Sequence, residues 1–131
     1  MRVLPLLLLP LLATACAGPG LPRLGSGEFV ATDVNGVPIV AGTRLTLVLG
    51  EDGQASGRGG CNSFTTTYKT QSQERIDFGP IAATRMACPQ EQMEQESRYF
   101  AILDAAESYS VYGSGAVSII APDGRAVRFR R

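Results

Sequence analysis

Residues 57–103 read GRGGCNSFTTTYKTQSQERIDFGPIAATRMACPQEQMEQESRYFAIL, and this stretch decides the fold. It contains two of the three cysteines, the densest cluster of glycines and the longest helical pattern in the chain. The whole chain has 131 residues, of which 44% are hydrophobic, and its formal net charge is zero. A chain of this length and composition is expected to form one domain around a single modest core.

The helix is predicted near residues 89–107. Proline fits the first turn, because the N–H group that Pro89 lacks would be unpaired there in any case. The helix dipole favours the negative charges of the N-terminal half, which are Glu91, Glu94 and Glu96. Met93, Phe100 and Leu103 fall on one apolar stripe, which we expect to be buried. The stripe is flanked by Tyr99, Ile102 and Ala106.

Short runs of alternating apolar residues predict about seven or eight short strands. The clearest runs before the helix contain Leu45, Leu47 and Leu49, and then Ile76 and Phe78. Asn35–Gly36 is a strong signal for a two-residue hairpin turn. After the helix, one interior face is expected to consist of Val117, Ile119, Ala121, Val127 and Phe129.

The N-terminal segment predicts export. Residues 1–15 contain one arginine, an apolar run and small residues, which is the pattern of a secretory signal. The LATAC sequence ending at Cys16 resembles a bacterial lipobox, so Cys16 is expected to carry lipid. The alternative is an ordinary cleaved signal that ends near a cysteine. Residues 16–27 are rich in glycine and proline and are expected to form a flexible tether, followed by the folded domain at 28–131.

Cys61 and Cys88 are the two thiols that remain if Cys16 carries lipid. In an oxidising compartment such a pair is expected to form a disulfide, with free buried thiols and redox chemistry as the alternatives. Gly59 and Gly60 precede the first of these cysteines and predict a sharp turn of the chain.

The residue types present exclude several kinds of site. The chain has no histidine, which is the usual general base at neutral pH and the commonest metal ligand. Four carboxylates lie in or beside predicted turns, and no two are singled out as an acid–base pair: Asp33, Asp52, Asp77 and Asp123. We therefore predict no catalytic residue, no metal site and no cofactor. No long basic run indicates nucleic acid binding.

Three linked segments carry a resemblance to a known family. They are Gly60-Cys61-Asn62, Phe78-Gly79-Pro80-Ile81-Ala82 and Thr84-Arg85-Met86-Ala87-Cys88-Pro89, followed by Glu96, Phe100 and Leu103. In order and spacing, residues 28–131 resemble the META domain (HslJ-like) family. The resemblance implies an α+β fold in which a bent antiparallel sheet, barrel-like in form, wraps a single helix. It assigns no catalytic residue, and the motif positions with a structural role are Gly60, Asn62, Thr84, Arg85 and Met86.

The resemblance and the N-terminal segment together predict a non-enzymatic lipoprotein of the bacterial envelope. Members of the family are largely envelope proteins, and some are associated with heat shock or antibiotic tolerance. We therefore expect a role in stress tolerance through binding or stabilisation, with an envelope protein as partner and the lipid on Cys16 as membrane anchor. Alanine rather than aspartate at Ala17 favours the outer membrane, facing the periplasm.

Two other functions stay open from the sequence. The first is a carrier of small apolar ligands, with a pocket enclosed by the sheet, and the second, less favoured, is an enzyme. The chain ends with Arg128, Arg130 and Arg131, which we expect to be a solvated basic end, with contact to anionic lipid as the alternative.

Overall fold

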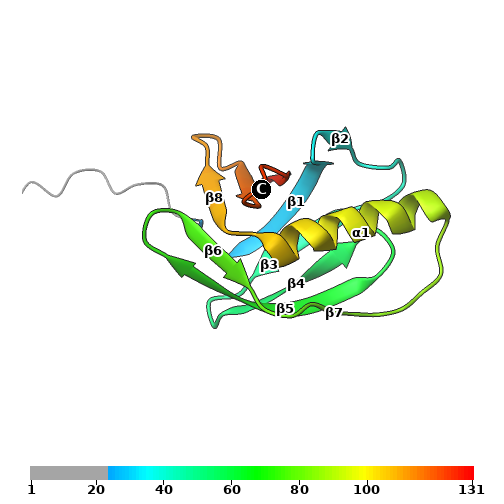
Figure 1. Ribbon diagram of the computed structural model, residues 1–131, viewed down its shortest axis with the longest axis horizontal. Coiled ribbons are helices and arrows are strands. Elements are labelled where there is room, and N and C mark those ends of the chain that lie inside the picture. Colours follow the sequence, from blue (N-terminus) through cyan, green and yellow to red (C-terminus); the bar gives the residue numbers. More distant parts are fainter. Residues whose placement is uncertain (1–23) are drawn as a thin grey trace, which may run out of the picture.

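The computed structural model describes residues 24–131, which form ten strands and one helix (Figure 1). The predicted signal at 1–15, Cys16 and most of the predicted tether lie outside the described residues. The elements are β1 (Gly27–Val34), β2 (Val37–Pro38), β3 (Leu45–Leu49), β4 (Gln54–Gly59), β5 (Ser63–Gln71), β6 (Arg75–Phe78), β7 (Ala82–Ala83), α1 (Gln90–Ala105), β8 (Ser108–Val111), β9 (Val117–Ile120) and β10 (Ala126–Arg130).

The strands form one antiparallel barrel. Their order is β10-β9-β8-β6-β5-β4-β3-β1, and β10 pairs with β1 to close the ring. The short strands β2 and β7 lie off this ring and pair with β1 and β5. The predicted α+β fold with a barrel-like sheet around one helix is therefore confirmed. The strand number exceeds the predicted seven or eight because two of the strands are only two residues long.

The ring has one weak seam, between β6 and β8. These two strands share a single register pair, Arg75 with Ser108, whereas β4 and β5 share five. Two backbone hydrogen bonds hold the seam: the N–H of Ile76 donates to the carbonyl of Glu107 at 3.2 Å, and that of Tyr109 donates to the carbonyl of Glu74 at 2.9 Å. The seam lies beside the C-terminal end of α1, which leads directly into β8 (Figure 1).

The inner face of the barrel is apolar and packs against α1. Alternation along each strand places one side chain in two toward the helix, and the predicted inward residues are all buried. They include Leu45, Leu47, Leu49, Ile76, Phe78, Val117, Ile119, Ala121, Val127 and Phe129. Aromatic rings from several elements meet around the helix, and the ring of Tyr99 lies 5.8 Å from that of Phe64 and 6.2 Å from that of Phe129.

The predicted buried stripe of the helix is wrong. Met93 is 44% exposed, and Phe100 is only partly buried, whereas Leu103 is buried as expected. The buried face consists of Gln95, Glu96, Tyr99, Ile102 and Leu103. It begins with two polar residues, which apolar periodicity does not detect. These two side chains are buried because they bond to the strands, as shown below.

The helix is slightly shorter than the predicted residues 89–107. Pro89 is its N-cap residue, with φ −51° and ψ 144°, and Ala106 leaves the helix with a ψ of 137°. Glu107, directly before β8, is already hydrogen-bonded to the sheet, because its N–H donates to the carbonyl of Ile120 at 3.0 Å. No helix within residues 24–131 is long and apolar enough to span a membrane.

Packing begins ahead of the expected domain start at residue 28. Leu24 is only 5% exposed and belongs to the core cluster. The guanidinium of Arg131 donates to the carbonyl of Ser26 at 3.2 Å and lies 4.6 Å from the ring centre of Phe29. Arg131 is therefore bound to the start of β1 and is not part of a freely solvated basic end.

Two substitutions test the corrected helix face. Leu103→Ala removes a fully buried side chain and is expected to lower the free energy of unfolding by about 2–5 kcal/mol. Met93→Ala removes an exposed side chain and is expected to change it by less than about 0.5 kcal/mol. Urea denaturation of the two variants measures both values. A larger loss for Met93→Ala than for Leu103→Ala would contradict the helix orientation.

Candidate functional site

The glycine-rich turn after β4 brings the backbone against the helix. Gly60 has a φ of +103°, a conformation that L side chains rarely adopt. A Cβ atom on Gly59 would lie 2.6 Å from the Oε2 atom of Glu96, so a side chain at this position would displace the carboxylate. The N–H of Gly59 donates to the carbonyl of Asn62 at 2.8 Å and closes the turn. The predicted sharp turn therefore has a specific purpose, which is to let the backbone approach Glu96.

Glu96 is the centre of this contact. Its carboxylate accepts hydrogen bonds from three donors: the backbone N–H of Cys61 at 3.0 Å, that of Asn62 at 2.6 Å, and the side-chain amide of Asn62 at 2.6 Å. The residue is only 7% exposed. Hydrogen bonds to an ionised acceptor are roughly twice as strong as neutral ones. The carboxylate thus binds the turn to α1.

Asn62 extends the contact to the segment before the helix. Its Oδ1 atom accepts hydrogen bonds from the hydroxyl of Thr84 at 3.0 Å and from the N–H of Met86 at 2.7 Å. The hydroxyl oxygen of Thr84 in turn accepts a hydrogen bond from the N–H of Ser63 at 3.2 Å. One buried asparagine therefore joins three parts of the chain: the turn, the segment after β7, and the helix.

The disulfide between Cys61 and Cys88 closes the same cluster, as predicted. The two Cα atoms lie 6.0 Å apart, within the usual range for a disulfide. Cys61 is buried and Cys88 partly exposed. In the chain-entropy model, a bond that closes a loop with a sequence separation of 27 is worth roughly 3–4 kcal/mol. The segment 84–88 is therefore fixed at both ends, by Asn62 and by the disulfide.

A second set of polar contacts, from Gln95 and Tyr99, fixes the helix on either side of Glu96. Gln95 accepts a hydrogen bond from the N–H of Val40 at 2.8 Å and donates one to the hydroxyl of Thr43 at 3.0 Å. The hydroxyl of Tyr99 donates to the carbonyl of Thr46 at 2.9 Å. Complete burial raises the pKa of Tyr99 well above its ordinary value, so the hydroxyl keeps its proton and remains a donor.

The structure brings most of the predicted motif residues together. Thr84 and the backbone of Met86 meet at the side chain of Asn62, which binds Glu96, and Gly60 shapes the turn that carries Asn62. Arg85 does not join them: it is exposed and forms no hydrogen bond or ion pair within residues 24–131. The side chain of Met86 is 55% exposed. The predicted site residues thus divide into a hydrogen-bonded set centred on the buried Asn62, which holds the loop, and the exposed side chains of Arg85 and Met86, which the loop presents.

Sequence reasoning missed the roles of Gln95 and Glu96. Glu96 was assigned to the helix dipole, together with its acidic neighbours. A signal was nevertheless present, because positions 95, 99, 102 and 103 have the spacing of one helical face. A carboxylate on that face, opposite a glycine-rich turn with free N–H groups, indicates an internal anchor.

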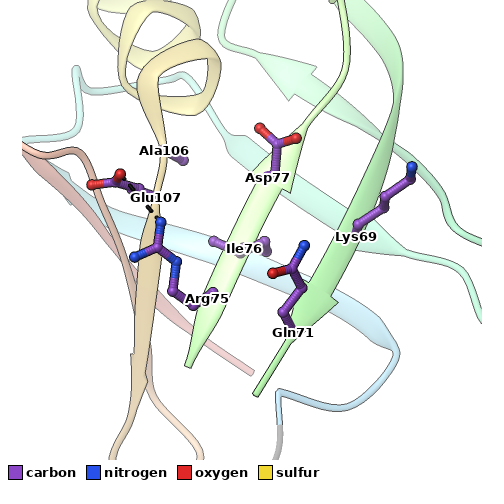
Figure 2. A pocket seen from close by; sticks show the side chains of 7 residues that line it. All are labelled: Lys69, Gln71, Arg75, Ile76, Asp77, Ala106 and Glu107. Atoms are coloured by element: carbon purple, nitrogen blue, oxygen red, sulfur yellow. Dashed lines mark hydrogen bonds and ion pairs between the residues drawn. The ribbon is translucent and has the colours of Figure 1, made fainter. Parts of the chain in front are cut away.

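Two surface hollows lie near these elements. One, of about 290 Å³, opens at the weak seam and is lined by Lys69, Gln71, Arg75, Ile76, Asp77, Ala106 and Glu107 (Figure 2). Arg75 reaches across it to Glu107, with an N–O distance of 3.2 Å. The other, of about 460 Å³, is a shallow groove along the exposed side of the helix and is lined by Cys88, Gln90, Met93, Glu94, Ser97 and Arg98.

The seam hollow carries mixed charge and no catalytic arrangement. Lys69 and Asp77 are register partners on β5 and β6, so the hollow contains two cations and two carboxylates in all. Its charges therefore balance, which gives no preference for an anion or a cation. Within residues 24–131, no group of three or more histidine, cysteine, aspartate or glutamate side chains is placed to hold a metal ion.

Glu96→Gln tests the buried anchor. The substitution places an amide N–H₂ group among N–H donors, so at least one donor loses its acceptor. We expect the free energy of unfolding to fall by about 1.5–3 kcal/mol, as for the loss of a hydrogen bond to a charged group. Glu94→Gln is the matched control, because Glu94 is exposed and accepts only from Gln90, one turn away at 2.9 Å. Chemical denaturation that gave equal losses for the two variants would rule out the anchor.

Comparison with known proteins places the chain in a family. The chain is similar to a protein from Burkholderia xenovorans solved by NMR, with a TM-score of 0.67 and 20% identity over 95% of this chain and 98% of that one. It is also similar to a DUF4847 family protein from Bacteroides vulgatus solved by crystallography, with a TM-score of 0.57 and 14% identity over 81% of this chain and 92% of that one. These likenesses establish the fold alone. No curated protein matches the chain. A family model for the META domain matches residues 22–131, and the chain therefore belongs to the META domain family.

Proposed function

We propose that this META domain protein is anchored by lipid in the bacterial envelope and acts by binding or stabilising an envelope component, not by catalysis. The observation that carries the proposal is that the polar motif residues spend their hydrogen bonds inside the protein. Glu96, Asn62 and Thr84 are committed to hydrogen bonds with one another and with the backbone. Groups that are already paired in this way are poor candidates for reaction with a substrate, but they hold a binding loop well.

The segment 84–88 is the part of the surface that we propose for partner contact. Its backbone is fixed at Met86 by Asn62 and at Cys88 by the disulfide, while the side chains of Arg85 and Met86 are exposed. A rigid loop loses little conformational entropy on binding. Methionine adapts its shape to irregular surfaces, and arginine is enriched at the centres of protein interfaces. These properties suit an envelope protein as partner.

The anchor and the location rest on the N-terminal sequence. The lipobox-like residues before Cys16 support lipidation, and Ala17 supports the outer membrane facing the periplasm. The disulfide is in keeping with an oxidising compartment. The resemblance to the META domain family supports a role in stress response or antibiotic tolerance.

The structure gives less support to the carrier of small apolar ligands. Tyr99, Ile102 and Leu103 of α1 are each at most 1% exposed and occupy the inner side of the sheet. The two hollows reported above both open at the surface of the protein. The helix thus fills the space that a carrier would leave for its ligand.

Lipidation of Cys16 is the first test of the proposal. Cells grown with a clickable fatty acid should incorporate the label into the wild-type protein and not into Cys16→Ser. The variant in which both Cys61 and Cys88 are replaced by serine is the control, and it should keep the label because the acyl chain is attached elsewhere. Label on Cys16→Ser equal to that on the wild type, or an unlabelled wild type, would contradict the anchor.

Photo-crosslinking tests the contact surface. A photoreactive residue at Met86 should capture one envelope component in intact cells, because the loop presents this side chain. The same residue at Val37 is the matched control, since Val37 on β2 is a similarly exposed apolar residue at 50%. Capture of the same component from both positions, or from neither, would rule out the loop as the binding surface.

A further inference from the structure

Three arginines lie on one outer face of the barrel. Inward residues of β10 are Val127 and Phe129, so alternation directs Arg128 and Arg130 outward, and both are exposed. Arg130 pairs with Val30 of β1, Val30 pairs with Thr46 of β3, and Thr46 pairs with Arg58 of β4. One cross-strand row therefore carries an arginine at each end, and its Cα atoms span about 14 Å, three interstrand steps of roughly 4.8 Å.

The two residues at the centre of this row have short side chains that are shielded from solvent. Val30 and Thr46 point outward, yet they are only 8% and 5% exposed, so longer side chains around them must shield them. Arg44 and Glu28 flank them and form an ion pair with an N–O distance of 2.7 Å. The face is thus a shallow surface of long side chains over β10, β1, β3 and β4, and it contains no pocket for a small molecule among those described.

The charge on this face is positive. Glu28 is paired with Arg44, and Asp33, opposite Arg128, accepts a hydrogen bond from the N–H of Gly36 at 3.0 Å. Within residues 24–131, Arg58, Arg128 and Arg130 form no ion pair. Four cations and two carboxylates give the face an excess of two positive charges, although the whole chain is formally neutral.

The face lies close to the point where the described chain begins. Arg131 binds the carbonyl of Ser26 and so holds the end of β10 beside the start of β1. Leu24 lies eight residues after Cys16 (24 minus 16), a distance of at most roughly 28 Å even when the chain is fully extended. A lipid on Cys16 would keep Leu24 within that distance of the bilayer, and with it the face that begins beside Ser26.

We propose that this face, with Arg58, Arg128 and Arg130, contacts the anionic phospholipid surface of the membrane. Guanidinium groups donate paired hydrogen bonds to phosphate oxygens and lose little hydration in doing so. A basic surface beside an acyl anchor is a second membrane signal and orients the domain as well as holding it. The distance argument rests on the proposed lipid anchor, whereas the charge of the face does not.

Vesicle sedimentation tests the proposal without the anchor. The probe is unlipidated protein of residues 17–131 with its disulfide formed, since the complete barrel and its core lie within 24–131. It should sediment with vesicles containing phosphatidylglycerol at low salt, remain free with pure phosphatidylcholine, and dissociate as the salt concentration rises. Changing Arg58, Arg128 and Arg130 together to glutamine should weaken binding about a hundredfold, since each basic residue near an anionic surface contributes roughly a fivefold factor.

A second triple variant controls for net charge. Lys69, Arg75 and Arg98 are also exposed, and changing them to glutamine removes the same charge from other parts of the surface. This variant should bind within about threefold of the parent protein. Equal binding to both kinds of vesicle, or an equal loss in the two variants, would overturn the proposal. Because the probe carries no lipid, either result stands whether or not Cys16 is acylated in cells.

Discussion

The buried carboxylate of Glu96 is the interaction on which the rest of the fold depends. It collects three N–H groups from the turn between β4 and β5. Gly59 is small because the carboxylate occupies the space of a side chain. Asn62 and the disulfide then attach the segment before the helix to the same point. The helix is therefore held inside the sheet by polar contacts at its N-terminal half and by apolar packing at its C-terminal half.

This division explains why Asn62 and Glu96 are polar although both are buried inside the domain. A barrel of eight short strands can enclose a helix in more than one rotation about the helix axis, since apolar packing is not directional. Hydrogen bonds from Glu96, Gln95 and Tyr99 to fixed backbone groups select one rotation. The backbone that carries the exposed side chains of Arg85 and Met86 is then held in place, which suits the recognition role that we propose for this loop.

Much of the fold could be predicted from the sequence, because strand alternation and glycine turns are local signals. The rows of Leu45, Leu47 and Leu49 and of Val117 and Ile119 are buried as their spacing indicates. The disulfide could be predicted because the N-terminal segment indicates export to an oxidising compartment, where the two remaining cysteines are expected to pair. The buried helix face was mispredicted, since periodicity counts apolar residues and this face begins with Gln95 and Glu96. The arginine face could not be predicted either, because Arg58 and Arg130 come to lie on one face only through the register of four strands.

The closure of the barrel by its first and last strands has a consequence for biosynthesis. Val30 pairs with Arg130, a separation of 100 residues (130 minus 30) along the chain. Pairings of this kind raise contact order and slow folding, since the intervening loop must be ordered before the contact forms. The ring stays incomplete until the final strand has left the ribosome. A nascent chain that still lacks β10 cannot complete the barrel, so the edges that β1 and β9 offer to this strand stay unpaired until it is made.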